Sequence, residues 1–130
     1  MTRHDYIVDT LVKLGFRTSL RGFDQFCECV EFYSDNRTTT MDNMYKFISA
    51  KFACSRSAIE KNLVRLFSCS DACTNIGKLF GIEIAVGCSK EIIATFSNYV
   101  CLHRDCYDED YSLFSTAYRL GSSDRFGSRI

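Results

Sequence analysis

The 130-residue sequence contains no proline and no tryptophan, and it has only seven glycines and two histidines. Without proline, helices can continue wherever the apolar pattern favours them. No apolar run approaches the roughly 18–20 residues that a membrane-spanning helix needs. Acidic and polar residues also occupy the N-terminal segment, where a signal peptide would be apolar. We therefore expect a soluble, cytoplasmic protein with no membrane partner.

The usual sequence marks of a catalytic or cofactor site are missing as well. The chain has no C-x-x-C, no H-E-x-x-H and no glycine-rich phosphate loop. Its two histidines, His4 and His103, lie near the N-terminus and beside the C-terminal tail, where we expect fraying and variation. We therefore expect no enzyme, no cofactor, no metal and no small-molecule substrate.

Eight cysteines are many for a chain of this length. They would indicate a disulfide framework in a secreted protein, but without a signal peptide we expect reduced thiols. Cys27, Cys69 and Cys101 fall within apolar patterns, so we expect them to act as small core residues. A remote alternative is a metal or thiol sensor built on Cys101, His103 and Cys106, although C-x-H and C-x4-C are not zinc-finger spacings.

The apolar pattern predicts an all-α fold. Hydrophobic residues make up 46% of the chain, which is enough for one domain with a sizeable core. They recur at helical spacing in six segments, with Thr40 and Ser55 as expected N-caps and Gly15 as an expected C-terminal stop. The segments are 5–14, 23–34, 41–52, 56–68, 71–79 and 90–102. We expect a domain over 1–102 and a C-terminal extension over 103–130.

Two stretches allow more than one interpretation. Residues 82–86 form an apolar run that fits a short strand or an extended connection. The extension carries Tyr107, Tyr111, Phe114 and Tyr118 at helical spacing, before a polar end that we expect to fray. These aromatic residues predict either a helix that caps the core or a surface for dimerisation or another partner.

Segments 41–52 and 56–68 form the strongest candidate for a functional unit. About three residues join them, and residues 41–67 contain five basic and two acidic residues, a net charge of +3. The expected inner face of the second segment consists of Ile59, Leu63, Leu66 and Phe67. Its expected outer face consists of Arg56, Ser57, Glu60, Lys61, Val64 and Arg65. This pattern is typical of a helix-turn-helix, although helical hairpins that bind nothing share it.

Five groups of residues resemble the landmarks of a known family, in the same order and with similar spacing. They are Leu11-x-x-Leu14-Gly15-Phe16 with Gly22-Phe23, Tyr45-x-x-Ile48-x-x-Lys51-Phe52, Ser57-x-Ile59-Glu60-Lys61-x-Leu63, Asn75-Ile76-x-x-Leu79-Phe80-Gly81 and Lys90-Glu91-Ile92-Ile93-Ala94. The chain thus resembles the C-terminal DNA-binding effector domain of the master sporulation response regulator of endospore-forming bacteria. The resemblance covers residues 5–102 and implies a six-helix fold that contains a helix-turn-helix.

The resemblance also implies a transcription factor that binds a short box of double-stranded DNA, with a homodimer or tandem copies on the DNA. It thereby implies a location at the bacterial nucleoid. Glu60 matches a family glutamate that faces cytosine, and Lys61 matches an arginine that faces guanine. Ser57 and Arg65 match positions near the phosphate backbone. The full set of expected DNA-binding residues is Lys51, Arg56, Ser57, Glu60, Lys61, Val64 and Arg65.

Several departures from the family pattern change this expectation. Ala58 and Val64 replace basic residues, which should weaken DNA binding and its salt dependence, while Arg56 can restore one charge. Lys46 stands where the family has proline. The chain starts almost directly on the effector-like domain, so we expect no phosphoacceptor receiver domain. The alternative function is a protein-interaction module that keeps the fold without binding DNA.

Overall fold

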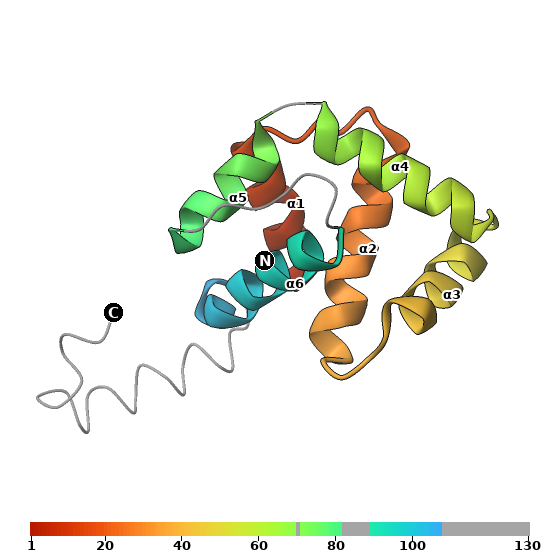
Figure 1. Cartoon of the computed structure of the whole chain (residues 1–130). Helices are drawn as coiled ribbons and strands as arrows, with labels where there is room; N and C mark the ends of the chain where they lie inside the picture. Colours follow the sequence, from red (N-terminus) through yellow and green to blue (C-terminus); the bar gives the residue numbers. More distant parts are fainter. Residues whose placement is uncertain (70, 82–88, 108–130) are drawn as a thin grey trace, which may run out of the picture.

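The computed structural model describes residues 1–69, 71–81 and 89–107. Its helices are α1 (Arg3–Leu14), α2 (Arg21–Asp35), α3 (Met41–Phe52), α4 (Arg56–Ser68), α5 (Ala72–Phe80) and α6 (Ser89–Leu102), followed by a 3-10 helix at Arg104–Cys106 (Figure 1). The described residues contain no strand, so the expected all-α fold of six helices is confirmed. No helix among them is long and apolar enough to cross a membrane.

Local capping explains where the helices begin and end. The Thr2 hydroxyl accepts a hydrogen bond from the Asp5 N–H, and the Asp5 carboxylate accepts one from the Thr2 N–H. This capping box starts α1 two residues before the apolar pattern predicts. The expected caps Thr40 and Ser55 are confirmed, because each hydroxyl accepts from a first-turn N–H of its helix at 3.1 Å. Gly15 ends α1 with a φ of 104°, also as expected.

Helix α2 is the central element of the core. It packs against α1, α3, α4 and α6, and Figure 1 shows it running between them. The ring of Phe26 in α2 lies 5.0 Å from that of Phe67 in α4, centroid to centroid, in an edge-on arrangement. It also lies 5.5 Å from Phe16 and 6.0 Å from Phe96 of α6. Because all four rings are buried, these sequence-distant segments share one apolar core.

Helices α2 and α4 cross closely at Gly22. A Cβ atom at this position would lie 2.4 Å from the backbone oxygen of Asn62 in α4, so any larger residue would push the helices apart. Beside the crossing, the Asn62 amide donates to the side-chain oxygen of buried Gln25 at 3.1 Å. Close packing and a hydrogen bond therefore fix α4 on α2.

The cysteines only partly follow the expectation from the apolar pattern. Cys27 is buried and Cys101 is half-buried, and the Arg37 guanidinium lies 3.0 Å from the Cys101 sulfur. The expectation for Cys69 is wrong, because its side chain is exposed. Cys69 is the C-cap residue of α4 and thus lies beyond the helix, so the inward stripe does not include it.

The start of the C-terminal extension packs on the domain. The ring of Tyr107 lies 5.3 Å from that of Tyr6 in α1, and its hydroxyl donates to the backbone oxygen of Val100 in α6 at 3.1 Å. Residues 82–86 and the aromatic residues Tyr111, Phe114 and Tyr118 lie outside the described residues. Of the four aromatic residues at helical spacing in the extension, Tyr107 is the one that the structure describes, and its side chain packs against the core.

Candidate nucleic-acid interface

Helices α3 and α4 form a helical hairpin with a tight turn. Ala53 takes a left-handed φ of 51° directly after α3, and Ser55 caps α4. The expected inner face of α4 is confirmed, because Ile59, Leu63, Leu66 and Phe67 are buried. Its expected outer residues are all exposed. The inward stripe thus anchors α4 and leaves the opposite face open to solvent.

Arg56, the first residue of α4, is held by groups of the hairpin itself. Its guanidinium is ion-paired with Asp42 of α3, and its Nε lies 3.3 Å from a carboxylate oxygen of Glu60. The same group lies over the ring of Tyr45, 5.0 Å from the centroid. Burial raises the pKa of Tyr45 to about 12, so this ring stays neutral beside the cation even well above neutral pH. Arg56 is therefore compensated by two carboxylates, and its contacts with Asp42 and Tyr45 join α4 to α3.

Lys51 near the end of α3 is also engaged within the protein. Its ammonium lies 2.7 Å from a carboxylate oxygen of Glu28 in α2. This hydrogen bond raises the pKa of Lys51 above its usual value. Ser57 lies exposed in the first turn of α4, on the side of the outer face.

The rest of the outer face carries charge that the described residues do not neutralise. Lys61 and Arg65 are exposed one turn apart, and neither makes an ion pair within the part of the chain that the structure describes. Between them lies Val64, with 45% of its surface exposed. Together with Glu60, these three residues line a shallow, open depression on α4. The depression thus has an apolar centre bordered by two cations and by the carboxylate of Glu60.

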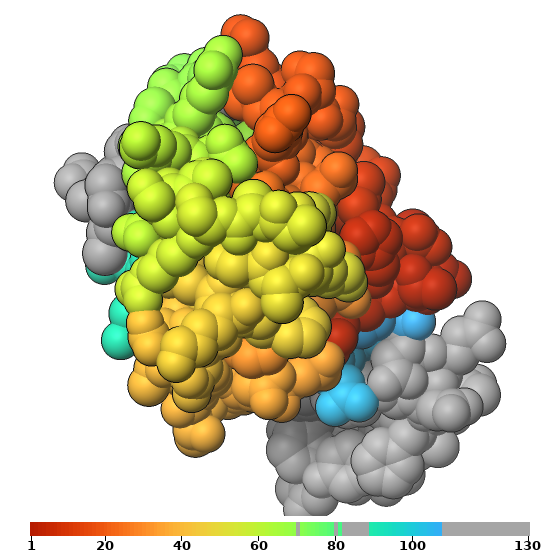
Figure 2. Space-filling model, turned by 90° about the vertical axis from the view of Figure 1, so that its right-hand side faces the viewer, coloured from red at the N-terminus to blue at the C-terminus, as the bar shows by residue number. Residues whose placement is uncertain are grey.

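A second basic feature lies beside this face and was missed by the sequence reasoning. A hollow of about 240 Å³ is lined by Ser19, Leu20, Arg21 and Gly22 at the start of α2 and by Asn62 and Arg65 of α4. Figure 2 shows the start of α2 and the loop before it (orange to red) lying against α4 (green). Arg21 belongs to residues 1–40, which carry five basic and six acidic residues. The net charge of that segment therefore gives no sign of a basic surface at Arg21.

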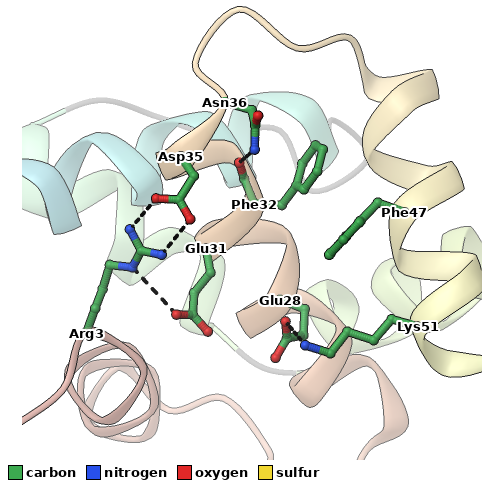
Figure 3. Close-up of a pocket in the computed structure, with 8 residues that line it drawn as sticks. All are labelled: Arg3, Glu28, Glu31, Phe32, Asp35, Asn36, Phe47 and Lys51. Atoms are coloured by element: carbon green, nitrogen blue, oxygen red, sulfur yellow. Dashed lines mark hydrogen bonds and ion pairs between the residues drawn. The ribbon is translucent and has the colours of Figure 1, made fainter.

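On another side of the molecule, α1, α2 and α3 enclose a groove of about 370 Å³ (Figure 3). Arg3 donates to both carboxylate oxygens of Asp35, at 2.8 and 2.9 Å, and contacts Glu31 at 3.5 Å. The opposite wall is the stacked pair Phe32 and Phe47, whose centroids lie 4.7 Å apart. The groove thus has charged residues that are paired with one another on one side and an aromatic wall on the other.

The structure brings together a different set of possible metal ligands from the one the sequence suggested. His4, Glu28 and Glu31 have ligand atoms within 4.8 Å of one another, and Cys101, His103 and Cys106 form no such group among the described residues. Glu28 and Glu31 already face the cations Lys51 and Arg3. These ion pairs compensate the negative charge that would attract a metal ion.

A scan against protein-family models and searches of curated proteins and of solved structures find no match to this chain.

Proposed function

We propose that this protein binds double-stranded DNA through the outer face of α4 and regulates transcription. The observation that carries the proposal is the pair of exposed cations, Lys61 and Arg65, on a helix whose opposite face is anchored in the core. An α-helix fits the major groove of B-DNA, and a rigid anchor is what a recognition helix requires. The turn between α3 and α4 has the length expected of a helix-turn-helix.

The residues of the outer face have chemistry suited to separate parts of the duplex. Lys61 can donate to the O6 and N7 acceptors of guanine, and Val64 can contact the methyl group of thymine. Arg65 and Ser57 suit the phosphate backbone. Glu60 suits the amino group of cytosine, but it shares its carboxylate with Arg56.

Lys51 and Arg56 contribute to binding in this proposal only if DNA phosphates replace their present partners Glu28 and Asp42. Because the described part of α4 presents only Lys61 and Arg65 as cations without an ion pair, one copy of the domain should bind weakly near physiological salt. A homodimer or tandem copies on DNA would supply the missing affinity. The sporulation-type role and the location at the nucleoid belong to the same proposal and derive from the sequence resemblance.

A titration of labelled random duplex DNA over a series of salt concentrations tests the proposal. The logarithm of the binding constant should fall linearly with the logarithm of salt, with a slope of about −0.9 for each phosphate contact. The control is the double variant Lys61→Ala/Arg65→Ala, whose fold is checked by circular dichroism and whose slope should be smaller. A wild-type slope near zero at low salt would contradict DNA binding.

The second candidate function is a protein-interaction module. It is favoured by the groove between α1, α2 and α3, where Phe47 leaves 46% of its surface exposed beside Phe32. If the protein fails to bind DNA, Phe47→Ala becomes the first variant to compare with wild type in partner-binding assays, since its ring is the most accessible part of that wall.

A further inference from the structure

Two arginines from different helices meet at the hollow beside the recognition face. Arg21 is the first residue of α2, and Arg65 lies in the last turns of α4. Both line the same hollow of about 240 Å³, together with the polar residues Ser19 and Asn62. Among the described residues no acidic side chain lines this hollow, so both arginines border a space without a counter-charge.

The two arginines of the hollow differ in this respect from three basic residues of the α3–α4 hairpin. Lys46, Lys51 and Arg56 of the same hairpin each pair with a carboxylate. Arg21 and Arg65 make no ion pair within residues 1–69, 71–81 and 89–107. Arg21 also lies in the first turn of its helix, where the helix dipole disfavours a cation. An anion bound in the hollow would compensate the charge of the two arginines and would also interact favourably with the N-terminal end of the α2 dipole.

The hollow is held in shape by the close crossing of α2 and α4. Gly22, next to Arg21, is in contact with the backbone of Asn62, and a Cβ there would lie 2.4 Å from its oxygen. Asn62 precedes Arg65 on α4 and is hydrogen-bonded to buried Gln25 at 3.1 Å. This frame fixes the two backbone positions from which Arg21 and Arg65 extend, so an anion that binds there has to order only their side chains.

We infer that Arg21 and Arg65 together bind one phosphate of the DNA backbone, at the edge of the recognition face. This inference depends on the proposed function, and it adds a contact from α2 to those of α4. Guanidinium groups bind phosphate oxygens through two parallel hydrogen bonds. Because Arg65 continues the line of Lys61 and Val64 along α4, a duplex that follows this face would pass the hollow. Arg21 therefore acts as a positioning contact without base preference.

A double-mutant cycle on random duplex DNA tests the shared phosphate. Arg21→Ala and Arg65→Ala should each lower affinity roughly tenfold at low salt, as expected for loss of a charge-assisted hydrogen bond. The affinity loss of the double variant Arg21→Ala/Arg65→Ala should be smaller than the product of the two single losses, because both residues contact the same phosphate. The double variant should reduce the salt slope by about 0.9, which corresponds to one phosphate. Arg21→Lys should retain part of the affinity, since it keeps the charge and loses the fork.

Arg104→Ala is the control, because it removes the same charge from the 3-10 helix that follows α6, at a residue that does not line the hollow. If Arg21→Ala binds DNA as Arg104→Ala does while Lys61→Ala still weakens binding, the phosphate site is overturned and the proposed function stands. If the affinity loss of the double variant equals the product of the two single losses, the two arginines act independently, and the inference that they share one phosphate is overturned. If wild-type protein shows no salt-dependent binding, the proposed function is overturned and this inference with it.

Discussion

The guanidinium of Arg56 lies over the ring of Tyr45, 5.0 Å from its centroid, and so joins the first residue of α4 to the middle of α3. The same group is ion-paired with Asp42. We expect Arg56→Ala to lower the free energy of unfolding by about 1 kcal/mol, the sum of an exposed cation–π contact and a surface ion pair. Chemical denaturation measures this loss.

Lys46→Ala is the control for that measurement, because Lys46 pairs with the same carboxylate at 3.6 Å but stacks on no ring among the described residues. It should change stability by less than about 0.5 kcal/mol. An Arg56→Ala protein that is as stable as wild type but binds DNA much more weakly would show that Arg56 contacts DNA instead.

Lys61 and Arg65 should differ in what they contribute to DNA recognition. Lys61→Ala should lower discrimination at one base pair by about 1–3 kcal/mol, because it removes a contact to a base edge. Arg65→Ala should weaken binding to all sequences alike, since phosphates carry no sequence information. Binding to a selected site and to its single-base variants checks both. Unchanged specific and random affinity in Lys61→Ala would rule out the assigned role of that residue.

Neighbouring residues on α4 should respond very differently to truncation. Leu63 is fully buried in the core, whereas Val64 is 45% exposed. Leu63→Ala should cost about 2–5 kcal/mol of stability, because it leaves a cavity. Val64→Ala should change stability by no more than about 0.5 kcal/mol. Thermal and urea unfolding of the two variants compare them directly, and equal losses would show that the orientation of α4 is wrong.

The ion pair between Arg3 and Asp35 should make stability depend on acid pH. The hydrogen bonds from Arg3 hold the pKa of Asp35 below its usual 3.8. Since the folded pKa is the lower one, the contribution is complete above about pH 4 and is lost as the pH falls through the folded value. It amounts to at most about 1 kcal/mol, because Asp35 is exposed.

Thermal melts of wild type and Asp35→Asn between about pH 6 and pH 2 measure this contribution. The variant should melt lower at neutral pH and approach wild type at acid pH. Asp9→Asn removes an exposed carboxylate of α1 that pairs with Lys13 at 2.9 Å, and it serves as the control for net charge. Parallel curves for wild type and Asp35→Asn would contradict a lowered pKa.

The thiols should separate into two reactivity classes. Burial raises the pKa of Cys27, Cys29 and Cys73 to about 12, whereas Cys69 and Cys106 are exposed. Because the thiolate is the reactive form, iodoacetamide at about pH 8 should label the exposed pair in native protein and the buried three only in denaturant. Peptide mass spectrometry after timed labelling checks this. Native labelling of Cys73 as fast as that of Cys69 would contradict its burial.

The helices were predictable because their determinants are local. Helix α4 has the bounds that its pattern predicts, since Ser55 caps it and four apolar residues recur on one face. Helices α1 and α2 both begin two residues earlier than the apolar pattern predicts. For α1 the reason is that the capping box of Thr2 and Asp5 precedes the first apolar residue of the pattern. The expectation for Cys69 failed although the end of α4 was predicted correctly, because residue 69 lies just past that end and no longer follows the inward stripe.

The sequence by itself determined the six helices, the inward stripe of α4 and the residue types on its outer face, because periodicity and capping act over a few residues. Only the tertiary structure decided which charges are free. Lys51 and Arg56 pair with acids 23 and 14 residues away, while Lys61 and Arg65 pair with none among the described residues. The close approach of α2 and α4 at Gly22 likewise brings Arg21 to the hollow beside Arg65. Ion pairs and shared hollows form between segments that only folding brings together, so no local pattern specifies them.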